Sequence, residues 1–101
     1  MAIDPNDISL EDGGSKGRYV YRADGTEAEM TFTRAGEGLV IIDHTGVPDA
    51  FRGQGVGAAL VTKAVADFRA QAKKVLPLCP FAAAQFRRHP EWTDLLQERK
   101  A

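Results

Sequence analysis

The sequence predicts an α+β fold with a mixed, mainly antiparallel sheet, one long helix after the central strand and two short C-terminal helices. Two observations lead to this prediction. Apolar segments separated by glycine turns indicate an antiparallel meander over residues 18–42, and an alanine-rich segment with helical spacing follows over residues 54–71. A short apolar segment at 74–79 then completes a strand–helix–strand unit, whose right-handed crossover makes its two strands parallel.

Length and composition are those of an ordinary globular domain. The chain has 101 residues, of which 44% are hydrophobic and 27% charged, and the formal net charge is -1. This charge argues against nucleic acid or an anionic membrane as a partner, and no apolar stretch is long enough to span a bilayer. The single cysteine excludes an internal disulfide, and the N-terminus lacks the features of a secretory signal, so we expect a cytoplasmic protein.

The chain divides into an acidic leading segment and one folded unit. Residues 1–16 are rich in acidic and small residues, so we expect a flexible tail there, with Ile8 and Leu10 as candidates for an added edge strand. Residues 17–101 are then a single compact domain. No internal repeat interrupts it.

Three strands are expected in the meander. Residues 18–22 and 27–33 alternate apolar with polar side chains on either side of Asp24-Gly25, which is a strong hairpin signal. Residues 39–42 are continuously apolar, which is typical of a central strand buried on both faces. A sheet buried in this way requires a helix on each face.

The second half of the chain is expected to be mainly helical. The long helix is expected to begin near Gln54 or Gly55 and to end near Gln71. Apolar residues recur at i, i+4 spacing over this stretch, namely Val56, Leu60, Ala64, Phe68 and Ala72. Pro77 lacks a backbone donor, which predicts that the strand at 74–79 separates from its neighbour and leaves a cleft. Pro80 begins a helix over 81–88, and a last short helix covers 91–99 after His89-Pro90.

The stretch VPDAFRGQGVGAAL, from Val47 to Leu60, predicts an anion site. Glycines ahead of a helix let the backbone approach a ligand closely, and the first helical N–H groups favour a phosphate or pyrophosphate. The stretch also fits the dinucleotide pattern GxGxxA from Gly53 to Ala58. A dinucleotide is disfavoured because a loop separates the first glycine from the strand, and because Cys79 stands where an acidic ribose partner is needed.

Four separated segments carry a resemblance to a known family. The spacing of Arg52, Gly55 and Gly57 resembles the coenzyme A pyrophosphate motif of the GNAT superfamily of N-acetyltransferases. The resemblance extends from about Gly17 to Trp92 and is greatest to the small, single-domain YjdJ-like subgroup. Its segments, in chain order, are His44-Thr45-Gly46-Val47-Pro48, Arg52-Gly53-Gln54-Gly55-Val56-Gly57, Pro77-Leu78-Cys79-Pro80-Phe81 and Arg88-His89-Pro90-Glu91.

The resemblance implies an acetyl-CoA-dependent N-acetyltransferase acting on an unidentified amine, either a small molecule or a protein lysine. It implies catalytic roles for His44 and Cys79. Histidine titrates near neutrality, and a thiol at a helix N-terminus is biased toward thiolate, so Cys79 could protonate the leaving thiolate or accept acetyl. The residues implied in acetyl-CoA (coenzyme A) binding are Val47, Arg52, Gly53, Gln54, Gly55, Val56, Gly57, Ala58, Cys79 and Phe81.

Structural interpretations of the same residues stay open. His44 can serve as a hydrogen-bonding residue of the sheet, Cys79 as a buried apolar filler, and His89 as a helix-end cap. The two histidines and one cysteine lie far apart in the sequence and predict no metal site. Asp43 and Asp49 could attract a cationic amine, although aspartates in loops usually form turns.

Two further function classes compete with the enzyme. The chain lacks the N-terminal helices with which larger GNAT members form an acceptor pocket, so a non-catalytic module that binds CoA or acyl-CoA for sensing or interaction is the alternative. A structural or nucleic-acid-binding protein with a vestigial loop is the third, and the near-neutral charge counts against it.

Overall fold

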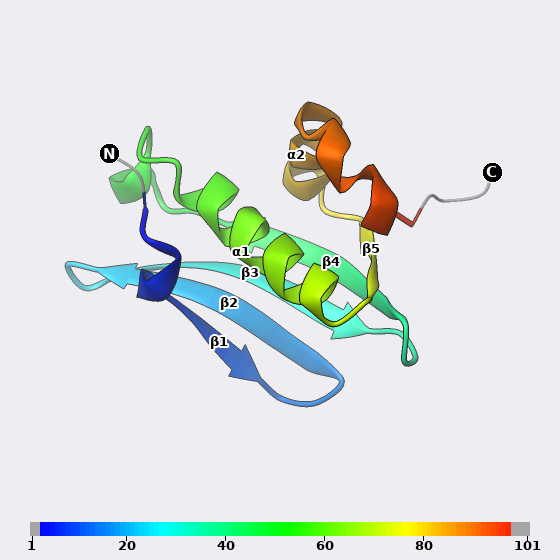
Figure 1. Ribbon diagram of the computed structural model, residues 1–101. Helices are drawn as coiled ribbons and strands as arrows, with labels where there is room; N and C mark the ends of the chain where they lie inside the picture. Colours follow the sequence, from blue (N-terminus) through cyan, green and yellow to red (C-terminus); the bar gives the residue numbers. More distant parts are fainter. Residues whose placement is uncertain (1–2, 98–101) are drawn as a thin grey trace.

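A computed structural model describes residues 3–97, and five strands in them form one sheet in the order β1-β2-β3-β4-β5. The first four strands are antiparallel neighbours, and β5 is parallel to β4. Figure 1 shows the sheet with α1 lying along it. This arrangement confirms the predicted mixed, mainly antiparallel sheet. The strands are β1 (Ile8–Asp12), β2 (Lys16–Ala23), β3 (Thr26–Arg34), β4 (Leu39–Gly46) and β5 (Lys74–Pro77).

Two α-helices and three short 3₁₀ helices complete the described chain. The α-helices are α1 (Val56–Ala70) and α2 (Pro80–Arg88), and the 3₁₀ helices are η1 (Pro5–Asp7), η2 (Asp49–Phe51) and η3 (Pro90–Leu95). The last helix is shorter and tighter than the one predicted over 91–99, whose end lies outside the described residues. It stops because the chain becomes extended at Leu96, which bridges to Val75, and Gln97 N–H donates to Val75 O at 2.8 Å.

The N-terminal segment belongs to the sheet from Ile8 onward, which corrects the flexible tail expected over 1–16 and confirms the alternative of an edge strand at Ile8 and Leu10. The edge strand β1 pairs with β2 along its whole length. Arg18 holds it in place, because its guanidinium forms ion pairs at 2.7–2.8 Å with Glu11 on β1 and with Glu27 and Glu29 on β3. These contacts link residues far apart in sequence, so the local acidic composition does not reveal them.

Both α-helices lie on the same side of the sheet. On that side Phe68 of α1 packs edge-on against Tyr19 and Phe32, with ring centroids 6.1 and 5.3 Å apart, and all three rings are buried. Near the other end of α1, Phe81 of α2 lies beside Gly57, within the first turn of α1. Within residues 3–97, no helix covers the opposite face of the sheet (Figure 1). The expectation that 39–42 is buried on both faces is therefore wrong, and Ile41 on the uncovered face is only partly buried.

A β-bulge in β4 changes which face its last residues occupy. Phe32 pairs with Ile42 and Thr31 with His44, so Asp43 is an extra residue without a partner on β3. Regular alternation would place His44 on the same face as Ile42. The bulge instead puts His44 on the uncovered face and turns Thr45 toward the helices.

The ladder between β4 and β5 ends early. Ile42 pairs with Pro77, and Ile42 O then accepts hydrogen bonds from Leu78 N–H at 3.1 Å and Cys79 N–H at 3.2 Å. Beyond this point β4 continues to Gly46, while the segment that follows β5 turns into α2. Pro77 is therefore tolerated because it occupies the last position of the ladder. We call the separation of β4, beyond Ile42, from the segment that follows Pro77 the β4–β5 divergence.

The C-terminus of α1 has the hydrogen bonds of a Schellman motif. Lys73 N–H donates to Phe68 O at 2.9 Å and Ala72 N–H to Arg69 O at 3.1 Å. Ala72 has a φ of 58°, a left-handed conformation that usually requires glycine. Ala72 is thus an exposed residue after the helix and does not extend the apolar stripe predicted from Val56 to Ala72.

Candidate functional site

The glycine-rich loop forms a turn that leads directly into α1. Gly53 and Gly55 have φ values of 79° and 74°, and a Cβ at either position would meet nothing within 4 Å. These glycines are therefore required by the backbone conformation and not by crowding. Gly55 is the N-cap of α1 and supplies no side chain to cap the helix.

The first turn of α1 presents free backbone donors. The first hydrogen bond of the helix runs from Ala59 N–H to Gly55 O at 3.0 Å, so the N–H groups of Val56, Gly57 and Ala58 precede it. Among the described residues, no side chain caps the start of this helix. Together with the helix dipole, these donors make a site suited to an anionic oxygen.

Gly57 has a different role, which is close packing. A Cβ at Gly57 would lie 2.7 Å from Cζ of Phe81 and 3.3 Å from Cγ2 of Val47. Val47 and Phe81 are 38% and 39% exposed, and Leu78 is 41% exposed. Val47 and Phe81 thus form an apolar strip over Gly57, at the surface beside the free N–H groups.

Arg52 and Gln54 are held by contacts within the loop. Arg52 donates to the Asp49 carboxylate at 3.0 Å, and both side chains are highly exposed. Gln54 Nε2 donates to Ala50 O at 3.2 Å. An exposed ion pair of this kind is weak, so the Arg52 guanidinium is available to a phosphate.

Cys79 and His44 lie at the β4–β5 divergence but on opposite faces. Cys79 is buried, is the N-cap of α2, and its Sγ lies 3.4 Å from Oγ1 of Thr45. His44 is exposed, and its ring lies close to Gly46. A Cβ at Gly46 would lie 3.1 Å from His44 Nε2, a tight contact that glycine avoids. The structure therefore places both residues at the β4–β5 divergence, but it does not bring them together as a hydrogen-bonded pair.

Sequence reasoning missed Thr45 as a neighbour of Cys79. Alternation along β4 gives no sign of it, because the bulge at Asp43 shifts the alternation. Asp43 itself is a strand residue and accepts a hydrogen bond from Thr33 Oγ1 at 2.7 Å. Asp49 lies in η2, where it pairs with Arg52.

His89 lies apart from this site. It is the C-cap residue of α2, its ring stacks on Trp92 with centroids 4.0 Å apart, and Nδ1 lies 2.9 Å from the Glu91 carboxylate. These contacts agree with a structural role at the helix end. This hydrogen bond lowers the pKa of Glu91 below the usual glutamate value.

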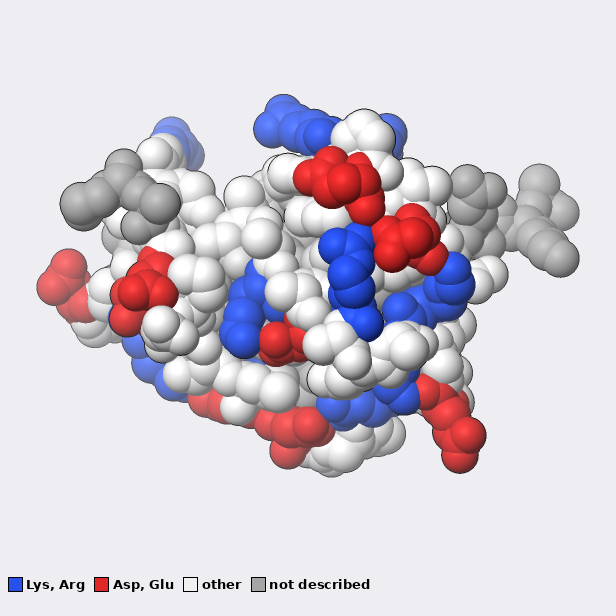
Figure 2. Space-filling view, viewed as in Figure 1, with Lys and Arg blue, Asp and Glu red and all other residues white. Residues whose placement is uncertain are grey.

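The surface charge is mixed. Figure 2 shows basic and acidic side chains interspersed on the visible face, without one basic patch among the residues drawn in colour or white. Within residues 3–97, no helix has the length and apolar character needed to cross a bilayer. Over the same range, no three His, Cys, Asp or Glu side chains are grouped in a way that suits a metal ion.

The site therefore combines helix N–H donors, an apolar strip and a divergence between two parallel strands. Comparison with known proteins assigns the chain to a family. Residues 18–95 match the model of the GCN5-related N-acetyltransferases, which covers more than half of the chain. The chain belongs to the GCN5-related N-acetyltransferase family.

A solved structure agrees with this assignment. The chain is similar to the NMR structure of a GCN5-like candidate N-acetyltransferase from Staphylococcus aureus, with 26% identity and a TM-score of 0.68. The similarity covers 93% of this chain and 92% of the other. A comparison with curated proteins gives no match.

Proposed function

We propose that the protein binds acetyl-CoA at the glycine-rich loop and transfers its acetyl group to an amine. The observation that carries this proposal is the set of free N–H groups at Val56, Gly57 and Ala58, next to the exposed apolar strip of Val47 and Phe81. A pyrophosphate has the negative charge that such donors favour, and the apolar part of a pantetheine arm can pack against the apolar strip. The family match supports the same cofactor.

In this proposal the pyrophosphate rests on the loop from Gly53 to Ala58, with Arg52 and Gln54 at its edge. The pantetheine arm passes Val47 and Phe81 toward the β4–β5 divergence. There the thioester lies near Cys79 and His44. The free cysteine agrees with a reducing compartment, and we propose the cytoplasm as the location.

The reaction needs few protein groups. The amine nitrogen attacks the thioester carbonyl, a C–N bond forms, and the C–S bond breaks to release CoA thiolate. Backbone N–H groups at the unpaired end of β4 can stabilise the oxyanion, and His44 can accept a proton from the amine. The Cys79 thiol can return a proton to the departing thiolate or form a transient acetyl-cysteine.

Calorimetry with CoA and acetyl-CoA tests the binding half of the proposal. Gly55→Glu places a carboxylate at the helix N-cap and should abolish binding, whereas Glu37→Gln, in the exposed β3–β4 turn, should leave it unchanged. Circular dichroism must show that both variants are folded. Binding by Gly55→Glu with the wild-type affinity contradicts the proposed loop.

Release of free CoA over a panel of amines tests the transfer half. His44→Ala and Cys79→Ala should each slow release, and intact-mass spectrometry should show an acetyl adduct on Cys79 if transfer is covalent. The second candidate function, a CoA-binding module without catalysis, is favoured by the separation of His44 and Cys79 on opposite faces of β4. It predicts CoA binding without turnover of any amine.

A further inference from the structure

The uncovered face of the sheet has a hollow that the glycine-rich loop does not use. Its volume is about 760 Å³. Glu11, Arg18 and Thr31 line it from three neighbouring strands, and they share a face because each is directly opposite the next in the sheet register. Asp43 of β4 borders it on the side of the divergence.

Most of the charge around the hollow is already paired within the sheet. Arg18 donates to Glu11, Glu27 and Glu29, and these hydrogen bonds raise the pKa of its guanidinium. Glu11 is shared between Arg18 and Arg22, which lowers its pKa below the usual glutamate value. These groups build the wall of the hollow and offer little net charge to a ligand.

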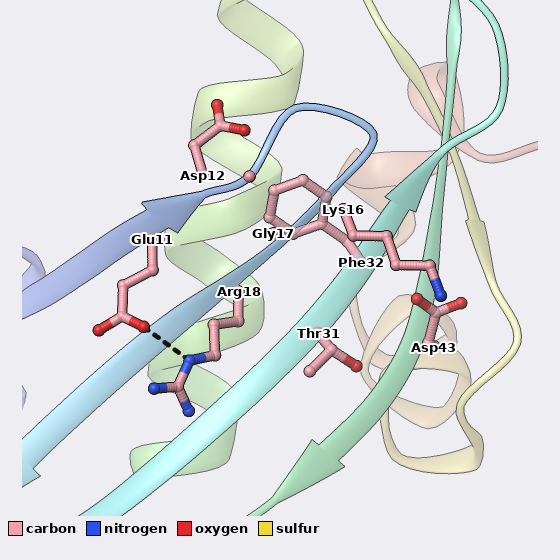
Figure 3. A pocket seen from close by; sticks show the side chains of 9 residues that line it. Glu11, Asp12, Lys16, Gly17, Arg18, Thr31, Phe32 and Asp43 are labelled. Atoms are coloured by element: carbon pink, nitrogen blue, oxygen red, sulfur yellow. Dashed lines mark hydrogen bonds and ion pairs between the residues drawn. The ribbon is translucent and has the colours of Figure 1, made fainter.

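Lys16 and Asp43 are the exception. Lys16 is exposed, and no ion pair joins its ammonium to another side chain in the part of the chain that the structure describes. Asp43 accepts a hydrogen bond on Oδ2 from Thr33, and within residues 3–97 no side chain donates to its other oxygen. Figure 3 shows the Lys16 ammonium and the Asp43 carboxylate extending toward one another. One positive and one negative group at the same hollow fit a ligand that carries both charges.

The position of Asp43 connects this hollow to the proposed reaction. Asp43 directly follows Ile42, the last β4 residue paired with β5, and the bulge places Asp43 and His44 on the same face. An ammonium group bound to Asp43 therefore lies at the start of the β4–β5 divergence, where the proposed thioester would lie. A carboxylate on the same ligand is then directed toward Lys16.

We propose that the hollow is the acceptor site and that the acceptor is a small zwitterion with a primary amine and a carboxylate, such as a free amino acid. This inference rests on the proposed function. In the reaction the ammonium loses two protons, one through His44 to solvent and one to the CoA thiolate. The nitrogen gains the acetyl carbon as the C–S bond breaks.

The test is titration of the isotope-labelled protein with the common amino acids, one at a time, followed by amide NMR. The strongest binder is then compared with its decarboxylated amine and its deaminated acid. We expect shifts at Lys16, Thr31 and Asp43, and an affinity at least about tenfold above that of either fragment. Equal affinity for a fragment contradicts the zwitterion, and no shift with any amino acid contradicts the site.

Variants separate this inference from the proposed function. Asp43→Asn and Lys16→Gln should each weaken amino-acid binding about tenfold, whereas Glu37→Gln should not change it. CoA binding measured by calorimetry should stay unchanged in all three variants. If the wild type fails to bind CoA, the proposed function fails; if it binds CoA but does not acetylate the amino acid that occupies the hollow, the acceptor assignment fails.

Discussion

Substitution of Gly57 by alanine separates cofactor binding from stability. The added Cβ would lie 2.7 Å from Cζ and 3.0 Å from Cε2 of Phe81, so the ring must move. Phe81 is 39% exposed, so its ring can swing outward. We expect the loss of buried apolar surface to cost about 1 kcal/mol of stability. Replacing glycine within a helix by alanine recovers roughly 0.5–1 kcal/mol. We therefore expect an unfolding free energy within about 1 kcal/mol of wild type.

The same movement should weaken CoA binding, because it displaces the apolar strip beside the free N–H groups. We expect a loss of about tenfold in affinity, measured by calorimetry, with stability measured by urea unfolding. Gly38→Ala is the matched control, because a Cβ there meets nothing within 4 Å. Unchanged CoA affinity in Gly57→Ala would refute the proposed path of the cofactor, and a loss of stability well above about 2 kcal/mol would refute the mobility of Phe81.

Three further predictions concern the surroundings of the site. Ala72→Gly should raise the unfolding free energy by about 1 kcal/mol in urea unfolding, because glycine adopts the left-handed conformation at the end of α1 without strain; a decrease would contradict the Schellman assignment. Burial and the hydrogen bond to Asp67 raise the pKa of the Tyr19 phenol, so its contribution to stability is complete below the unfolded pKa of about 10 and is lost as the pH rises toward the folded value. Tyr19→Phe should reduce the loss of unfolding free energy at alkaline pH, measured by unfolding at a series of pH values. An identical pH profile in wild type and variant would contradict this role of Tyr19. Arg52→Gln should lower CoA affinity in calorimetry while unfolding changes by less than about 0.5 kcal/mol, because the exposed pair with Asp49 is weak, and unchanged affinity would remove Arg52 from the site.

Short-range patterns were sufficient to predict much of the fold. The alternation of apolar residues predicted β2 and β3, and the i, i+4 spacing predicted the buried side of α1 from Val56 to Phe68. The strand–helix–strand order correctly predicted that β5 is parallel to β4. These features depend on residues close together in the sequence, where periodicity is informative.

Features that depend on distant residues could not be predicted in this way. The sequence offered the edge strand β1 only as an alternative, through Ile8 and Leu10, because Arg18 from the next strand holds it and four of its five residues are exposed. The relation of His44 to Cys79 depends on the bulge at Asp43, which contains no glycine and leaves no sign in the sequence. The hollow beside Lys16 likewise forms only when β1, β2, β3 and β4 are placed in one sheet.

The bulge at Asp43 also determines where the chain can tolerate a change in length. Deleting Asp43 would remove the bulge and still leave His44 on the uncovered face and Thr45 beside Cys79, because His44 would then follow Ile42 in regular alternation. The nearby turn at Gly36 and Gly38 has open space around both glycines, so an insertion there lengthens a surface loop without changing any strand register. Within the same hairpin, the chain can thus lose one residue at the bulge or gain one in the turn without moving the flanking side chains to the other face of the sheet.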